Sequence, residues 1–168
     1  MRIISGGQSG VDRAALDAAL VIGMAYGGWC PAGGWAEDSP EPPGVLQQYP
    51  LLRPTPLADP AQRTEWNIRD AGATLILVES RGLAASQGTM LARALAQKYR
   101  KPLLVVDLDA PDAHERAVSW LRALVEAHGP DLALGIGGPR ESEAPGICAL
   151  ATAFLEALLD QASRWPGA

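Results

Sequence analysis

Short apolar runs alternate with amphipathic segments along most of this chain, and this alternation constrains the fold more than any other feature. Residues 73–78, 103–106 and 132–136 form runs that are almost continuously apolar. Such runs are typical of parallel strands that are covered on both faces. The sequence therefore predicts an α/β fold in which an open parallel sheet carries helices on both faces.

The spacing of apolar residues predicts where the other elements lie. A first strand is expected at residues 2–5. Helices are expected at residues 11–22, 60–71, 87–100, 115–127 and 147–159. Ser9 and Asp12 have the spacing of a capping box, which predicts that Ser9 begins the first helix. Residues 27–60 hold most of the chain's 14 prolines and are expected to form one long loop. Long ordered loops in compact domains are usually functional.

Length, charge and cysteine content bound the class of protein. A chain of 168 residues is expected to form a single domain, residues 1–168. Its net charge of -5 argues against a nucleic-acid partner. Residues 1–7 are too short and glycine-rich for a signal peptide, and no apolar run is long enough for a membrane partner. We therefore expect a cytoplasmic protein. Cys30 and Cys148 are expected to be reduced thiols, and no zinc signature is present.

Two glycine turns that follow predicted strands are candidate anion sites. Residues 6–13 read Gly-Gly-Gln-Ser-Gly-Val-Asp-Arg, so free backbone N–H groups and a helix N-terminus would face a ligand. The spacing matches neither a dinucleotide fingerprint nor a Walker loop, and a tight turn without a ligand is the alternative. Residues 137–142 form the second turn, in which Arg140 could fork onto an oxyanion. Alternatively, Arg140 pairs with Glu141 or Glu143 on the surface.

Two further segments carry weaker signals. Residues 86–89 open a helix with small side chains, which helix capping explains equally well. In the helix expected at residues 60–71, Arg63, Asn67 and Asp70 share one polar face, which either points across a cleft or is solvated. Three tryptophans at positions 29, 35 and 66 flank these charges, and they would either stack on a purine or pterin ring or fix the loop in place.

Four blocks of sequence resemble one known family. They are residues 6–17, residues 27–31 with 36–38, residues 62–70, and residues 138–142 with 145–147. Over about 150 residues and in this order, they resemble the molybdenum carrier proteins, the circularly permuted YpsA-like branch of the SLOG superfamily.

The resemblance implies a Rossmann-like fold related to the lysine-decarboxylase-like phosphoribohydrolases, and it implies a homo-oligomer, either a dimer or a tetramer. The ligand it implies is a small anionic molecule: molybdenum cofactor, a molybdate- or tungstate-like oxyanion, or alternatively a nucleotide. The binding residues carried over by position are Gly6, Gly7, Gln8, Ser9, Gly10, Asp12, Arg13, Arg63, Thr64, Asn67, Gly88, Thr89, Arg140, Glu141 and Ser142.

The chain departs from the family pattern in two places. Residues 32–35 read Ala-Gly-Gly-Trp where family members commonly carry basic residues, and residues 84–86 read Ala-Ala-Ser in place of a Gly-Gly-Ser turn. We therefore expect Arg13, Arg63 and Arg140 to hold an anionic ligand more than the loop does. The phosphoribohydrolase signature is also incomplete, because only its end remains at residues 87–89.

Three functions are compatible with these residues. The first is a binding protein for molybdenum cofactor or a molybdate-like oxyanion. The second is a nucleotide N-glycosidase in which Glu37 or Asp38 would be the catalytic carboxylate. The third is a nucleotide sensor without catalysis. The sequence favours binding because no specific nucleophile–base pair or metal cluster can be assembled from it, although it leaves enzyme activity open.

Overall fold

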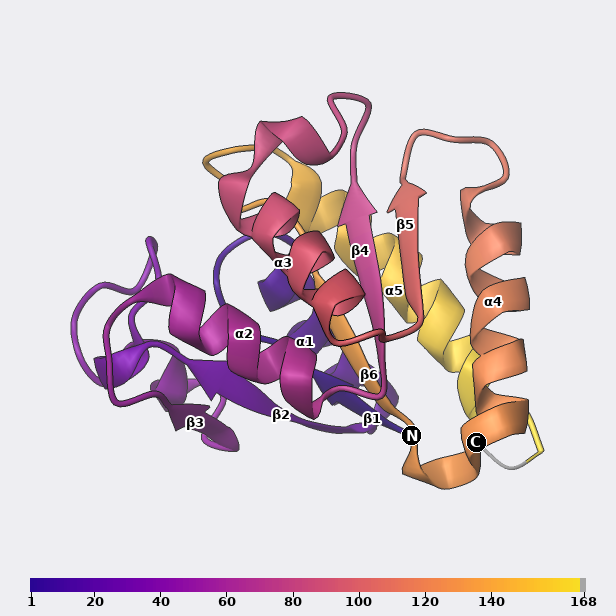
Figure 1. The fold of residues 1–168 in the computed structure, drawn as a ribbon, viewed down its shortest axis with the longest axis horizontal. Coiled ribbons are helices and arrows are strands. Elements are labelled where there is room, and N and C mark those ends of the chain that lie inside the picture. The colour runs from indigo at the N-terminus through magenta and orange to yellow at the C-terminus, as the bar shows by residue number, and fades with distance from the viewer. Residues whose placement is uncertain (167–168) are drawn as a thin grey trace.

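The computed structural model describes residues 1–166 and contains, within that range, a sheet of six parallel strands in the order β3-β2-β1-β6-β4-β5 (Figure 1). The strands are β1 (Arg2–Ile4), β2 (Ala25–Cys30), β3 (Leu52–Pro54), β4 (Ala73–Val78), β5 (Leu103–Asp107) and β6 (Ala133–Gly137). The predicted α/β class and open parallel sheet are therefore confirmed.

Helices cover both faces of the sheet, as predicted (Figure 1). The helices α2 (Pro60–Asp70) and α3 (Gln87–Lys98) lie on one face, and α1 (Val11–Ile22), α4 (Ala113–His128) and α5 (Ile147–Ser163) lie on the other. The main core lies under this second group, where alanines of α1 let it pack closely against α5 and the sheet. A smaller apolar cluster joins α2 to α3. This cluster joins the C-terminal halves of the two helices, so their N-terminal ends are free to border a site.

The start of α1 corrects one prediction. The helix begins after Gly10, which has φ 75°, and no side chain caps it, so Ser9 is not the N-cap. The Ser9 hydroxyl instead bonds Glu37 and accepts the Glu141 N–H at 3.2 Å. A backbone contact takes the place of the capping box, because the Val11 N–H donates to the Pro139 carbonyl at 3.2 Å.

The expected loop at residues 27–60 is only partly a loop, because it contains most of β2 and all of β3. Two features hid these strands. Gly28 has φ 132°, and a Cβ there would lie 2.2 Å from the Ser5 carbonyl, so this strand needs glycine. β3 pairs only with β2, and an edge strand tolerates Pro54. The remaining segment, with short 3₁₀ turns at Ala32–Gly34 and Gly44–Gln47, packs around the fully buried Tyr49.

The strand order brings three carboxyl ends together. β6 lies between β1 and β4, and the register pairs Ile4 and Thr74 with Gly135, and Ile76 with Gly137. The two glycines leave β6 without side chains beneath α2 and α3. In open parallel sheets, ligands bind outside the carboxyl ends of the strands at the point where the strand order reverses. The carboxyl ends of β1, β6 and β4 lie at this point.

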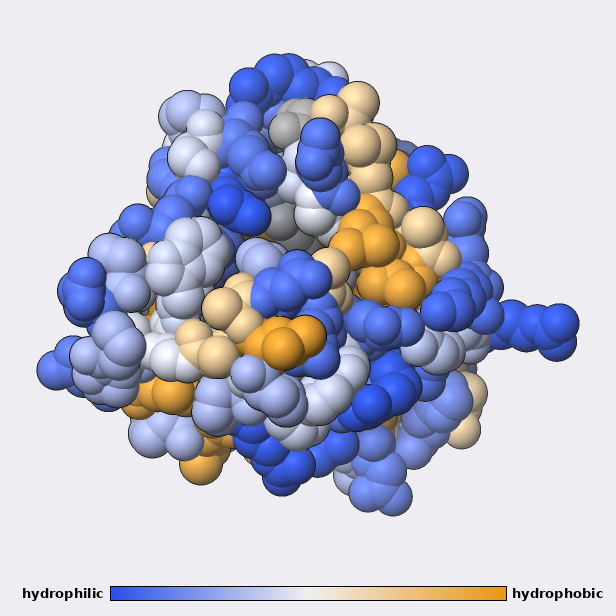
Figure 2. Space-filling model, turned by 60° about the vertical axis from the view of Figure 1, so that its left-hand side comes forward, coloured by the Kyte–Doolittle hydropathy of each residue, from blue (hydrophilic) through white to orange (hydrophobic). Residues whose placement is uncertain are grey.

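The exposed surface is mixed. Figure 2 shows apolar residues in separate clusters among hydrophilic ones. The large exposed apolar side chains are Leu20, Val21, Leu51, Leu57, Met90 and Leu150. Exposed apolar residues of this kind are ordinary on protein surfaces, and the oligomer stays a prediction. Within residues 1–166, the helices lack the combination of length and apolar character needed to cross a bilayer.

Candidate functional site

A small cavity lies between the sheet and the helices α2 and α3. This inner cavity, of about 50 Å³, is bordered by the ends of β1 and β6, by the first part of β4, by α2 and by the starts of α1 and α3. A second space of about 310 Å³, the outer cleft, is lined by the starts of α2 and α3 and by Arg140 and Glu143. Arg63, Thr64 and Gly88 line both spaces, so the outer cleft adjoins the inner cavity.

Three buried polar atoms, each on a residue that lines the inner cavity, have no hydrogen-bond partner within residues 1–166. They are Thr74 Oγ1, Thr89 Oγ1 and Arg63 Nε. Both threonines are 2% exposed. A buried polar group without a partner costs about 1–3 kcal/mol, and native proteins rarely leave one. That all three residues line one cavity is consistent with a place for a molecule that accepts hydrogen bonds.

Arg63 is the cation of the inner cavity. Its Nη1 donates to Asp12 Oδ2 at 2.6 Å, and the side chains are 14% and 7% exposed. The arginine reaches the carboxylate across Gly6, where a Cβ would lie 2.2 Å from Nη1. Asp12 therefore balances the charge of Arg63, while Nε stays without a partner.

The first glycine turn is joined to the long loop rather than open to a ligand. The Gln8 side-chain carbonyl accepts the Ser9 and Glu37 N–H groups at 3.0 and 2.9 Å. The Arg13 guanidinium donates to the Gly7 carbonyl and forms two bonds to Asp38 at 2.9 and 3.0 Å. The predicted residues Gly7, Gln8 and Arg13 thus lie near one another, but they line neither the inner cavity nor the outer cleft.

Glu37 ties three segments together. Its carboxylate accepts the Ser9 hydroxyl, the Ser142 hydroxyl at 2.5 Å and the Ser142 N–H at 3.2 Å. Burial alone raises the pKa of Glu37, but the hydrogen bonds from Ser142 and Ser9 and the charge of Arg140 outweigh it and hold the pKa below its usual value. The glycine turns at residues 6–10 and 138–142 consequently lie against each other through this carboxylate.

Substitution of Glu37 by glutamine tests whether its carboxylate links the two glycine turns. Because the pKa is lower in the folded protein, the ionised carboxylate stabilises the fold above its unfolded pKa of about 4.3, and this contribution is lost as pH falls through the folded-state pKa. Glu37→Gln should therefore lower the melting temperature at neutral pH. The difference from wild type should shrink in acid. Glu41→Gln, in the same loop and exposed, is the control; an equal effect of both variants would contradict the link.

The second glycine turn presents Arg140 to the outer cleft. Within residues 1–166 no carboxylate lies within ion-pair distance of its guanidinium, which lies 6.0 Å from the Trp35 ring centroid. Glu143 instead accepts the Arg140 N–H at 3.0 Å, and Glu141 accepts the N–H groups of Gly146 and Cys148. The alternative pairing of Arg140 with these glutamates is therefore not found.

The polar face of α2 is neither wholly solvated nor wholly turned to the cleft. Asn67 pairs with the backbone of Trp29, accepting its N–H at 2.7 Å and donating to its carbonyl at 2.9 Å. Asp70 accepts the Trp29 indole N–H at 2.7 Å, and the Trp29 and Trp66 rings meet edge to face at 4.6 Å. These contacts fix α2 on β2, so Trp29 and Trp66 hold these two elements together.

The start of α3 supplies the wall opposite α2. The Ser86 hydroxyl accepts the Thr89 N–H at 3.2 Å, which makes Ser86 the N-cap. A Cβ at Gly88 would meet only Ser86 Oγ, at 3.8 Å, so this glycine faces open space. Thr64 Oγ1 donates to the Pro60 carbonyl at 2.9 Å and borders both spaces.

Sequence reasoning missed Thr74. The only signal for it is a hydroxyl in the otherwise apolar strand β4. Its register partner Gly135 would place a Cβ 3.7 Å from Thr74 Oγ1, so the glycine leaves room beside the hydroxyl.

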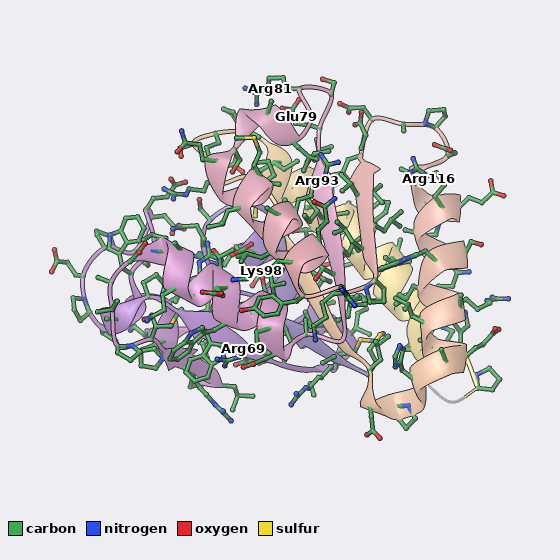
Figure 3. The ribbon with its side chains drawn as sticks, viewed as in Figure 1. Arg69, Glu79, Arg81, Arg93, Lys98 and Arg116 are labelled. Carbon is green, nitrogen blue, oxygen red and sulfur yellow. The ribbon has the colours of Figure 1, made fainter. Side chains whose placement is uncertain are left out.

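Charged residues outside the site make local surface contacts (Figure 3). Arg81 pairs with Glu79 on the connection after β4. Lys98 Nζ and the Tyr99 hydroxyl donate to Glu65 at 3.3 and 2.7 Å, which links α3 to α2. Within residues 1–166 no group of three or more His, Cys, Asp or Glu side chains could hold a metal ion.

Comparisons with known proteins show the family to which the chain is similar. The model of the circularly permutated YpsA SLOG family matches residues 3–159. A crystal structure of a "Putative molybdenum carrier protein" from Syntrophus aciditrophicus SB is 36% identical, covers 94% of each chain and has a TM-score of 0.79. No curated protein matches the chain.

The sheet order and helix layers define an α/β protein with a Rossmann-like fold. Within that class, the chain belongs to the circularly permutated YpsA SLOG family.

Proposed function

We propose that this protein binds a molybdate- or tungstate-like oxyanion in the inner cavity and acts as its carrier. The observation that supports the proposal most strongly is that Thr74, Thr89 and Arg63, which line one small cavity, each carry a buried polar atom without a partner within residues 1–166. Two hydroxyls and a guanidinium N–H are donors for the oxygens of an oxyanion. The name of the similar protein from Syntrophus aciditrophicus agrees with this class of cargo.

The outer cleft extends the proposal to larger ligands. Its volume of about 310 Å³ lies in the range of small-molecule pockets. Molybdenum cofactor or a nucleotide would therefore place its oxyanion end near Arg63 and its remaining part in the outer cleft, beside Gly88 and Arg140. Arg140 has no carboxylate partner within residues 1–166 and could bind the second charged group of such a ligand.

Binding without turnover is the proposal that the carboxylates favour. Glu37 is held by two serines, and Asp38 pairs with Arg13. Neither residue lines the inner cavity or the outer cleft. A glycosidase needs a carboxylate within reach of the scissile bond, so the positions of Glu37 and Asp38 do not favour them as catalytic residues, although Asp12 and Glu143 line the two spaces.

Thermal unfolding with a ligand panel tests the proposal. The panel holds molybdate, tungstate, sulfate, phosphate, AMP and ADP-ribose. A ligand at 1,000 times its Kd adds about 4 kcal/mol and raises the melting temperature by several degrees. We expect shifts with molybdate and tungstate that decrease in Arg63→Ala. Arg116→Ala, an exposed change on α4, should leave them unchanged.

Other outcomes would contradict the proposal. Shifts with nucleotides alone would favour the sensor or the hydrolase, and chromatography for a free base after incubation with AMP would separate these two. The absence of a shift with every oxyanion at saturating concentration would remove the inner cavity as an oxyanion site.

A further inference from the structure

We infer that Asp12 makes the inner cavity select an oxyanion that binds together with a proton. The inference rests on the proposed function, because it concerns the same cavity. It adds the chemical form of the cargo: an oxyanion that presents a hydroxyl to Asp12.

The geometry places both oxygens of the Asp12 carboxylate at the cavity wall. Asp12 is 5% exposed and lines the inner cavity. Its Oδ2 accepts from Arg63, and its Oδ1 lies 3.1 Å from the position of a Cβ on Gly137, which also lines the cavity. Within residues 1–166 no hydrogen bond reaches Oδ1. The residues that line the cavity therefore carry two buried hydroxyls without partners within residues 1–166, on Thr74 and Thr89, and one carboxylate oxygen of Asp12 that accepts no hydrogen bond there.

The charges around Asp12 make a fully ionised anion unfavourable. Arg63, from α2, is the charged group within ion-pair distance of Asp12. The Ser5 hydroxyl donates to the backbone carbonyls of Asp12 and Ile136 and not to the Asp12 carboxylate. Arg13, the next residue of α1, is paired with Asp38. Arg63 and Asp12 together are neutral, so a dianion would leave the site with a net negative charge in surroundings of low dielectric.

A proton between Asp12 and the anion removes the repulsion between the two negatively charged groups. It replaces the repulsion between two acceptors with an O–H···O bond in which the anion carries the proton. Phosphate and arsenate are partly present as protonated monoanions near neutral pH, so these forms fit directly. Molybdate and tungstate fit with uptake of one proton. Sulfate carries no proton in this range and should be rejected.

Calorimetric titration of the full chain tests the inference. Between about pH 6 and pH 8, the molybdate affinity of the wild type should fall about tenfold for each pH unit, because the bound state holds one more proton. Titrations in buffers with different protonation enthalpies should show uptake of that proton. Sulfate should not compete with molybdate.

Asp12→Asn gives the matched variant, because asparagine keeps an acceptor for Arg63 and offers an N–H donor to the anion. In this variant we expect sulfate to bind and the pH dependence of molybdate binding to disappear. Asp17→Asn is the control on the same helix, since Asp17 bonds Tyr49 and lines neither the inner cavity nor the outer cleft.

Failure of the inference and failure of the proposed function would give different results. Molybdate that binds the wild type equally at all pH values, with sulfate competing, would overturn the inference and leave the proposed function in place. No binding of any oxyanion to the wild type would overturn both. The wild-type pH series does not depend on how well Asp12→Asn folds.

Discussion

Replacement of Arg63 by methionine should lower the free energy of unfolding by about 3–5 kcal/mol and abolish oxyanion binding. The variant keeps most of the apolar stem but leaves the 5% exposed Asp12 carboxylate without its cationic partner. A buried charge without a partner is among the most destabilising changes in a protein. Urea unfolding would measure the stability, and calorimetry the binding.

Two further variants make this result specific to the pair. Arg63→Met combined with Asp12→Asn should recover most of the stability, because the buried Asp12 charge is gone. It should not recover the binding, because the guanidinium donor of Arg63 is still missing. Arg69→Met, on the same helix, should change stability by less than about 1 kcal/mol, since its pair with Asp70 is exposed. An unchanged stability of Arg63→Met would show that the Asp12 carboxylate finds another partner.

Replacement of Thr74 by valine should separate binding from stability. Valine has a similar shape, and the lost hydroxyl has no partner within residues 1–166. The fold should therefore keep its stability or gain up to about 1–3 kcal/mol. The loss of a hydrogen bond to an anion should weaken molybdate binding about tenfold or more. The melting temperature and a calorimetric titration give both values.

Thr55→Val is the matched control. Thr55 is equally buried, at 2% exposure, but its hydroxyl bonds the carbonyls of Cys30 and Leu57. We expect this variant to lose stability and to bind molybdate as the wild type does. The opposite pattern, a destabilised Thr74→Val with unchanged binding, would mean that the Thr74 hydroxyl serves the fold rather than a ligand.

Most of the layer structure could be predicted from the sequence, because it depends on local apolar patterns. β4 coincides with its apolar run. α1 ends at Ile22, just before Gly23, because glycine adopts the left-handed φ of 75° without the strain that a side chain would cause. The strands β2 and β3 could not be predicted, because Gly28 and Pro54 read as loop residues until the neighbouring strands are in place.

The site was harder to predict, because tertiary pairing decides which predicted side chains face a ligand. Arg13, Arg63 and Arg140 look equivalent in the sequence. Pairing with Asp38 takes Arg13 to the long loop, while Arg63 enters the inner cavity and Arg140 lines the outer cleft. Thr74 reads as one residue of a buried strand until β6 brings Gly135 beside it.

A crystal structure of the protein grown with tungstate would show directly whether the inner cavity holds an oxyanion, because tungsten gives a strong anomalous signal. We expect one peak in the inner cavity, with tungstate oxygens within hydrogen-bond distance of Thr74 Oγ1, Thr89 Oγ1 and Arg63 Nε. A peak elsewhere, or an inner cavity without tungsten at a saturating concentration, would contradict this expectation.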